Sequence, residues 1–507
     1  MNKKMEALTL DEKIGQLFVT GFPGKEPSQE FLSLVREEKV GNVILFSHNV
    51  SDKNQMAGLN RLLQKEIIST TGIIPIISID EEGGVVTRLP KDTAIMPSAM
   101  AQAAANDKEL IYQGARITGR QLRALGVNMN LAPVLDINSN INNPVIGVRS
   151  FGETREDVVK FGESAVIGYN EEGILCSGKH FPGHGDTDVD SHLGLPAIER
   201  TMDELENREL FPFIKLRKKL PAITIAHVVV PTLEPRRIPC TISKPVITDY
   251  LRNTLGYRGI IVSDCMEMNA MNQFGTIEEN VVAALEAGID LIFISHTSSL
   301  VKRAVSAVKK AVEEHKLSVD RIDKAVTRIL AAKEMLSCGQ DVNAEEAGTD
   351  EQVKFAEEFL EKTIFPLEAA KDKFYLGDNP LFIGIAPSRT TLVSNQINTE
   401  PNFSDFMTSK YHGTGIVCSL DPTKEELDYV KKMIMGRTSV VTGTLNAHLY
   451  QGQRKLLEII DDTTIATALV SLRNPYDNIL IGKEMFYISL YEYSERTLNI
   501  LTKYFSQ

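Results

Sequence analysis

The stretch "IPIISID", residues 74–80, joins a continuous apolar run to a terminal carboxylate, and this pattern decides the fold. Seven similar apolar runs occur before residue 300: "IGQLFVTGF" (14–22), "GNVILFS" (41–47), "VNMNLAPVLDI" (127–137), "ILCSGKH" (174–180), "AITIAHVVV" (222–230), "GIIVSDCM" (259–266) and "DLIFISH" (290–296). Continuous apolar runs are typical of parallel strands covered on both faces. Stretches with helical spacing, such as "KELIYQGARITGRQLRALG", separate them. Eight strand–helix units over roughly 300 residues predict an α/β fold of the (β/α)₈ TIM-barrel type.

A second region of α/β alternation follows the predicted barrel. After a helix over 318–336 comes a polar stretch, and then a helix is expected near 350–363. From about residue 378, short apolar runs alternate again with helical stretches, which predicts a smaller C-terminal α/β domain with an open sheet. The predicted domains are a catalytic barrel over 1–338, a linker with a helix over 339–372, and an α/β domain over 373–507. Within the last, "VSLRNPYD" (470–477) is interpreted as a strand that turns at Pro475.

The composition restricts the partners of the chain. A net charge of −12 over 507 residues disfavours nucleic acid and anionic membranes as partners, because both require a basic surface. The five cysteines are scattered without a CxxC pair, which suits a reducing compartment. No apolar stretch has the length of a membrane-spanning helix or of a signal peptide. We expect a cytoplasmic protein, unless a leader has been trimmed, and the oligomeric state stays open.

Polar groups end most of the predicted barrel strands. In a barrel of this type the functional groups belong at the C-terminal ends of the strands. The runs end in ionisable or imidazole side chains, namely Asp80 with Glu82, Asp136, Lys179 with His180, His227, Asp264 and His296. We expect these ends to form the site, with His227 and His296 in structural or supporting roles.

The loop "KHFPGHGDTDVDSHLGLP" (179–196) follows the fifth run and allows three interpretations. His180 and His184 have a zinc-ligand spacing, but Pro182 and the neighbouring glycines disfavour the helix that this spacing needs. The second interpretation is a phosphate-binding loop, but no helix start with Lys-Ser/Thr follows this stretch, as such a loop would require. We therefore predict neither a metal nor a cofactor. The third interpretation is a catalytic pair: Asp190 and His192 point to the same side of an extended segment, so the carboxylate can fix the imidazole tautomer for proton transfer.

Four motifs together resemble glycoside hydrolase family 3, and more closely its NagZ-type β-N-acetylglucosaminidases in the two-domain form. They are "DEEGGVVTRL" (80–89), "NPVIGVRSFG" (143–152), the 179–196 loop and "IIVSDCMEM" (260–268). The resemblance implies that Asp264 is the nucleophile and that His192, oriented by Asp190, is the general acid and base. It also implies sugar-binding roles for Asp80, Arg88, Arg149, Lys179 and His180. Glu81 departs from the family pattern, which commonly has glutamine there.

The resemblance implies a retaining glycosidase that releases terminal, non-reducing β-linked N-acetylglucosamine. Its expected substrates are chitooligosaccharides or peptidoglycan-derived glycans such as muropeptides, in the setting of cell-wall recycling. Two alternatives stay open: a β-N-acetylglucosaminide phosphorylase on the same scaffold, and a non-catalytic glycan-binding protein. A phosphorylase needs cations or N–H donors for phosphate. Arg236 and Arg237, on the loop after the sixth run, are cations not assigned to the sugar that could serve phosphate, and we favour water as the acceptor.

Overall fold

The computed structural model describes residues 5–187, 194–336, 342–366, 373–386, 401–482 and 485–506. Its larger sheet is a closed barrel of eight strands that pair in chain order, with β1 also parallel to β8. The strands are β1 (Phe18–Thr20), β2 (Asn42–Leu45), β3 (Ile76–Ile79), β4 (Met129–Asn130), β5 (Leu175–Phe181), β6 (Ala222–Ile225), β7 (Ile260–Cys265) and β8 (Leu291–Ile294). Each coincides with one of the eight predicted runs, although β5 extends one residue past its run, so the predicted barrel is confirmed.

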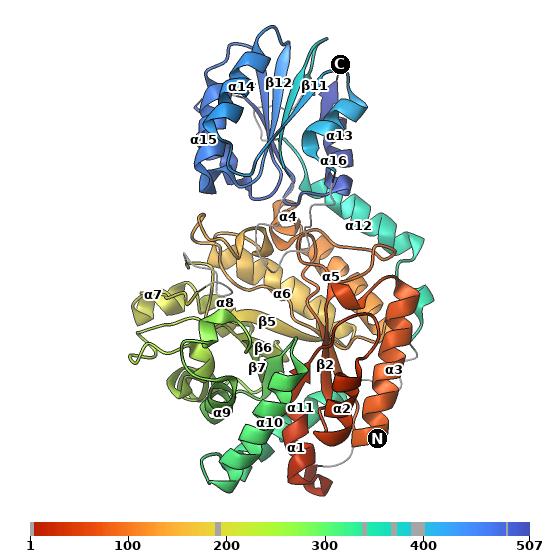
Figure 1. Ribbon diagram of the computed structural model, residues 1–507, viewed down its shortest axis with the longest axis vertical. Coiled ribbons are helices and arrows are strands. Elements are labelled where there is room, and N and C mark those ends of the chain that lie inside the picture. Colours follow the sequence, from red (N-terminus) through yellow and green to blue (C-terminus); the bar gives the residue numbers. More distant parts are fainter. Residues whose placement is uncertain are drawn as a thin grey trace.

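Helices surround this barrel (Figure 1). They are α1 (Leu10–Gln16), α2 (Gln29–Glu37), α3 (Lys53–Thr71), α4 (Ala99–Ala104), α5 (Lys108–Ala124), α6 (Arg155–Glu171), α7 (Met202–Asn207), α8 (Phe211–Leu216), the π-helix η5 (Pro245–Thr254), α9 (Ile277–Ala287), α10 (Ser298–Glu313) and α11 (Val319–Met335). In α10, Val301, Val305 and Val308 are buried, and their spacing forms a stripe that packs onto the barrel. The Thr276 side chain and Glu279 form a capping box at the start of α9, which fixes where this helix begins.

The second domain contains a parallel sheet of five strands in the order β11-β10-β12-β13-β14. The strands are β10 (Leu381–Ile385), β11 (Thr414–Cys418), β12 (Ser439–Thr444), β13 (Ala466–Ser471) and β14 (Phe486–Ser489), and the helices are α13 (Phe403–Lys410), α14 (Lys424–Ile434), α15 (Gln451–Asp461) and α16 (Glu495–Leu501). Figure 1 shows α14 and α15 on one side of this sheet and α13 and α16 on the other. The predicted open α/β domain is confirmed.

The helix α12 (Asp350–Thr363) leads from the barrel to the second domain (Figure 1). It coincides with the helix predicted near 350–363. Two contacts tie its C-terminal end to the end of the chain: Lys503 forms an ion pair with Glu361, and the Tyr504 hydroxyl donates to Ile364 O (2.7 Å). The expected domain boundaries at 338 and 372 fall outside the described residues and stay predictions.

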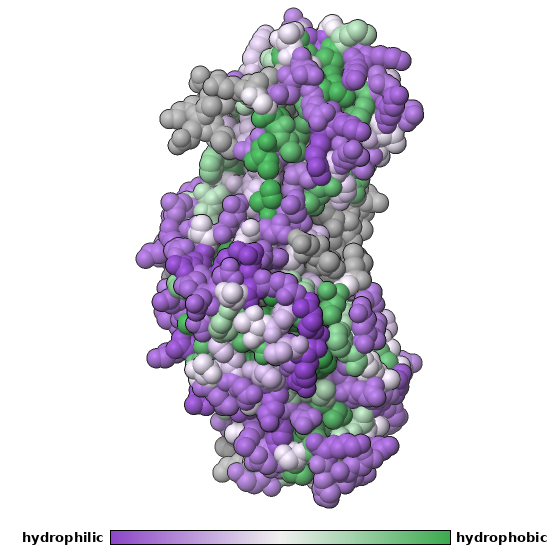
Figure 2. Space-filling model, turned by 90° about the vertical axis from the view of Figure 1, so that its left-hand side faces the viewer, coloured by the Kyte–Doolittle hydropathy of each residue, from purple (hydrophilic) through white to green (hydrophobic). Residues whose placement is uncertain are grey.

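The surface of both domains is mainly hydrophilic on the face shown in Figure 2, with small scattered hydrophobic patches. Among the described helices, none is both long and apolar enough to cross a bilayer.

Candidate active site

A cavity of about 1370 Å³ opens at the C-terminal ends of the barrel strands. Its lining includes every described residue that the sequence assigns to the site: Asp80, Arg88, Arg149, Lys179, His180 and Asp264. These residues come from segments up to 184 positions apart (264 minus 80), and the closed barrel brings them together. The C-terminal face of a barrel is where such enzymes place their chemistry.

Four buried or half-buried charges form one alternating network beside the cavity. The Lys179 ammonium lies 2.8 Å from Asp80 Oδ1 and 2.7 Å from Glu82 Oε1. Arg149 donates to both Glu82 oxygens, each at 2.8 Å, in a bidentate pair. Burial alone would raise the pKa of Glu82, but Arg149 and Lys179 hold that pKa well below its ordinary value. Because two cations face two carboxylates, the charges can stay ionised although buried.

His180 is oriented by a carboxylate from the neighbouring strand segment. Its Nδ1 lies 2.6 Å from Asp136 Oδ2, and its backbone N–H also donates to Asp136. Burial would raise the pKa of Asp136, but His180 and His184 outweigh it and lower that pKa. The contact with Asp136 orients the ring of His180, so that Nε2 lies 3.5 Å from Arg149 Nη2. Burial, with His180 nearby, lowers the pKa of His184 to about 4, so His184 is neutral at pH 7.

Glu81 shapes the turn that carries Arg88. Its Oε2 accepts from the Thr87 hydroxyl (2.7 Å) and from the backbone N–H groups of Arg88 (2.8 Å) and Leu89 (3.1 Å). Burial raises the pKa of Glu81 to about 7 despite these donors. The carboxyl is therefore easier to protonate than an exposed glutamate, and its accepting oxygen has the role that glutamine would have at this position.

Asp264 lies half-buried near the end of β7 and faces the cavity. Its Oδ1 accepts from the Cys265 N–H (2.7 Å). His227 is buried, and its Nε2 donates to Cys265 O (2.9 Å) while Nδ1 contacts the Thr241 hydroxyl (2.7 Å). These contacts fix the backbone beside Asp264 and agree with the supporting role expected for His227. His296 lines the cavity together with Phe46, whose ring centroid is 4.7 Å from its own.

Asp190 and His192 lie outside the described residues, so the predicted dyad is not placed by the structure. The described residues on either side of 188–193 are fixed. Asn143 Nδ2 donates to His184 O (2.8 Å) and Thr187 O (3.0 Å). Asp186 on one side forms an ion pair with Arg200 on the other (2.8 Å).

The sequence placed Glu82 and Asp136 at the strand ends expected to form the site but gave them no role, and it did not assign the second domain to the site. Both acids were visible at strand ends, but their contacts with cations from other strands depend on the three-dimensional fold. The second domain lines the cavity through Glu492, Tyr493, Ser494, Glu495, Arg496 and Asn499. Arg236 is paired with Glu234 (2.7 Å) and Arg237 with Glu199 (2.6 Å), and neither is in the cavity lining. Among the described side chains, no group of three or more His, Cys, Asp or Glu could hold a metal ion.

A closed barrel with paired acids and bases around one cavity at its C-terminal face is the arrangement of a barrel enzyme. Residues 9–332 match the model of the glycosyl hydrolase family 3 N-terminal domain, and the chain belongs to this family. The family predicted from the four motifs is therefore confirmed.

Relatives of known name support the same branch. The chain is 33% identical over 317 residues to the beta-hexosaminidase A of Pseudoalteromonas piscicida, covering 56% of this chain and 53% of that relative. It thus spans about half the length of that relative. It is 32% identical over 275 residues to the beta-hexosaminidase of Idiomarina loihiensis, covering 54% and 81%. A glycoside hydrolase family 3 beta-N-acetylglucosaminidase from Paenibacillus sp. str. FPU-7 is similar over both domains, with 36% identity, a TM-score of 0.88 and coverage of 98% and 96%.

Proposed function

We propose that the protein is a retaining β-N-acetylglucosaminidase that releases terminal, non-reducing N-acetylglucosamine. The observation that carries the proposal is the meeting of Asp264 and five predicted sugar-binding residues in one cavity. Further support comes from the Paenibacillus β-N-acetylglucosaminidase, which is similar over almost the whole chain. The substrates we propose are chitooligosaccharides and peptidoglycan-derived glycans, including muropeptides of cell-wall recycling.

In the proposed mechanism, Asp264 attacks the anomeric carbon and forms a covalent glycosyl-enzyme. His192, oriented by Asp190, protonates the leaving oxygen as the glycosidic bond breaks. It then removes a proton from water, which attacks the same carbon and releases Asp264. Two displacements retain the configuration. A histidine replaces the second carboxyl group that most retaining glycosidases use.

The charge network supplies the proposed sugar-binding groups. Asp80 and Lys179 are joined by one ion pair, and Arg149 is held by Glu82. Charged donors and acceptors give stronger and more directional hydrogen bonds to hydroxyls than neutral groups do. Because their partners fix these side chains before the sugar arrives, little ordering cost is left for binding.

Water is the proposed final acceptor. Arg236 and Arg237, which could have served phosphate, are each paired with a glutamate and do not line the cavity. Among the cations that line the cavity, Arg149 and Lys179 contact carboxylates and Arg496 is paired with Glu492. Arg88 is assigned to the sugar, and Lys91 is exposed. This arrangement favours hydrolysis over phosphorolysis.

The test is product analysis with an aryl β-N-acetylglucosaminide and with chitobiose, with and without millimolar phosphate. We expect N-acetylglucosamine as the product in all cases, with its β anomer appearing first by NMR. Asp264→Ala should abolish turnover, and His192→Ala should slow chitobiose far more than the activated aryl glycoside. A sugar 1-phosphate that dominates in phosphate would establish the phosphorylase. Sugar binding without any turnover would establish a glycan-binding protein.

A further inference from the structure

The segment 473–477 of the second domain lies against the barrel loop that carries Arg149. Asn474 Oδ1 accepts from the N–H of Val148 (3.1 Å), the residue directly before Arg149. The phenol oxygen of Tyr476 accepts from Asn138 Nδ2 (2.7 Å). Asn138 Oδ1 in turn accepts from the N–H of Gly147 (3.1 Å). Two side chains of the second domain thus act on the same short segment, 147–149.

The two surfaces approach closely at this point. Gly147 has φ +47°, and a Cβ there would lie 2.5 Å from Asn474 Oδ1, so the contact requires glycine. Val148 and Tyr476 are buried in one apolar cluster with Val85 and Val86, which belong to the turn after β3. A shift of 473–477 would therefore move the segment before Arg149.

The second domain holds 473–477 in place by several bonds of its own. Asn474 N–H donates to Asn446 Oδ1 (3.2 Å), and the Tyr487 hydroxyl donates to Pro475 O (2.7 Å). Asp477 accepts from the Thr444 hydroxyl (2.6 Å). His448 adds another contact with the barrel loop, because its Nε2 donates to Ile141 O (2.9 Å). The segment is a fixed support rather than a loose loop.

We infer that Asn474 and Tyr476 are positioning residues of the active site, which set the place of the Arg149 guanidinium through the segment 147–149. Arg149 must keep its bidentate pair with Glu82 and its place beside His180 while it lines the cavity. The second domain would then take part in sugar recognition without its segment 473–477 touching the sugar. The inference rests on the proposed function, which gives Arg149 its sugar-binding role.

The test compares three single variants with wild type. Asn474→Ala removes the acceptor for Val148, and Asn474→Asp keeps an oxygen in its place. Tyr476→Phe removes the hydroxyl that accepts from Asn138 and also hydrogen-bonds Glu153. The matched control is Asn379→Ala, which removes an asparagine that precedes β10, at the opposite end of the sheet, where it donates to Gly436 O (3.1 Å). The measurements are KM and kcat on an aryl β-N-acetylglucosaminide, the Kd of N-acetylglucosamine by calorimetry, and Tm.

We expect Asn474→Ala to raise KM and the Kd of N-acetylglucosamine by about tenfold, the effect of weakening one charge-assisted hydrogen bond. Its kcat should change less than KM. Tyr476→Phe should give a smaller shift in the same direction, and Asn474→Asp should restore most of the affinity. If Asn474→Ala does not fold, the KM and Kd of Tyr476→Phe test the inference instead.

Variants that lose Tm but keep wild-type KM and Kd would overturn the inference, because the contact would then serve stability alone. A shift of equal size in Asn379→Ala would overturn it as well. A wild-type protein with no activity on the aryl glycoside contradicts the proposed function. An active wild type with unchanged variants contradicts only the inference.

Discussion

Glu81 and Glu82 are neighbours in the sequence and both are buried, yet their pKa values shift in opposite directions because their partners differ. Glu82 contacts two cations, Arg149 and Lys179, which outweigh the cost of burial and keep it ionised. Glu81 accepts from a hydroxyl and two backbone N–H groups, which offset less of that cost. Its pKa rises to about 7 through burial. Glu82 thus supplies charge to the site, and Glu81 supplies an acceptor oxygen to the turn that carries Arg88.

Glu81→Gln should change the pH dependence of stability with little effect on activity. A carboxyl whose pKa is raised on folding stabilises the protein fully below its unfolded pKa, about 4.3, and this contribution is lost as pH rises through about 7. The stability of wild type relative to Glu81→Gln should therefore fall by about 1.4 kcal/mol for each pH unit in this window. The measurement is chemical denaturation from pH 4.5 to 8, with kcat/KM expected within about twofold because glutamine retains an acceptor oxygen.

Glu82→Gln provides the comparison of opposite sign. The pKa of Glu82 is lowered on folding, so its stabilisation is present above about pH 4.3 and is lost as pH falls below that value. Relative to Glu82→Gln, wild type should gain stability as pH rises from the acid side. The free energy of unfolding of wild type relative to each variant is compared as a function of pH. If it changed with pH in the same way for both variants, the two carboxyl groups would not differ in pKa in solution.

At the scale of elements, the sequence predicted all eight barrel strands and the open α/β sheet of the second domain. Their apolar runs are continuous because parallel strands are buried on both faces, and this pattern is local. The ends of elements were less predictable: "IGQLFVTGF" contains both the end of α1 and the strand β1. The run 470–477 does turn, since β13 ends at Ser471 and a 3₁₀ helix begins at Pro475. Its contact with the barrel depends on domain packing, which the sequence pattern does not report.

Asp290, just before β8, joins several elements at the end of the barrel opposite the cavity. Its buried carboxylate forms ion pairs with Arg252 of η5 and with Arg328 (3.0 Å) and Arg321 (3.5 Å) of α11, and it also accepts from Ile261 N (3.0 Å) of β7. Burial lowers the pKa of Arg252 to about 10, and Asp290 offsets part of this effect. One carboxylate therefore pairs with three cations, one on η5 and two on α11, and its bond to Ile261 N links them to β7.

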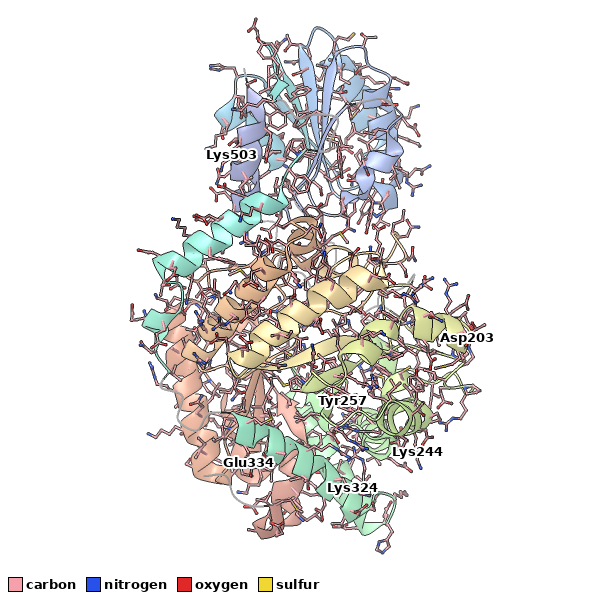
Figure 3. All side chains as sticks on the ribbon, turned by 180° about the vertical axis from the view of Figure 1, so that it is seen from behind. Asp203, Lys244, Tyr257, Lys324, Glu334 and Lys503 are labelled. Carbon is pink, nitrogen blue, oxygen red and sulfur yellow. The ribbon has the colours of Figure 1, made fainter. Side chains whose placement is uncertain are left out.

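Asp290→Asn should destabilise the barrel and leave the chemistry unchanged. Removing the carboxylate leaves the buried Arg252 and the half-buried Arg321 and Arg328 without their counter-charge, and such a loss typically costs about 3–5 kcal/mol for a buried pair. We expect a clear fall in Tm by calorimetry, with kcat/KM at 25 °C within about twofold of wild type. Asp320→Asn is the matched control, because Asp320 pairs with Lys324 on the exposed face of α11 in the barrel part of the molecule (Figure 3). That variant should leave Tm nearly unchanged. A similar Tm in both variants would mean that Asp290 does not hold these elements together.

At the scale of the whole molecule, the site was predicted where it follows motifs on the barrel and missed where it depends on packing between distant segments. Asp80, Arg88, Arg149, Lys179, His180 and Asp264 each stand in a motif that the sequence displays, and all of them line the cavity. Glu82 and Asp136 act through partners more than forty residues away (149 minus 82 is 67, and 180 minus 136 is 44). The second-domain residues that line the cavity follow no motif that marks them. Their role becomes visible only when both domains are placed around one cavity.

Because both domains line the cavity, a bound sugar should stabilise them together. Arg496 of α16 donates to Ile95 O (2.6 Å) and Met96 O (3.3 Å) of the barrel while Glu492 holds its guanidinium (2.8 Å). Ligand that binds only the folded state adds about 2.7 kcal/mol at a concentration of one hundred times Kd. Saturating N-acetylglucosamine should therefore slow amide hydrogen exchange in barrel segments and also in α16 of the second domain.

Arg496→Ala should separate the two responses. Without the bonds to Ile95 and Met96, bound N-acetylglucosamine should still protect the barrel, while the protection of α16 should fall to a small fraction of its wild-type value. Arg437→Ala is the control, because Arg437 bonds Asn379 Oδ1 (2.7 Å) and the Thr414 hydroxyl (2.6 Å) within the second domain. It should keep the wild-type response. Hydrogen exchange read by mass spectrometry distinguishes these cases segment by segment. Wild-type protein in which the sugar protects the barrel alone would show that the second domain lines the cavity without sharing the energy of binding.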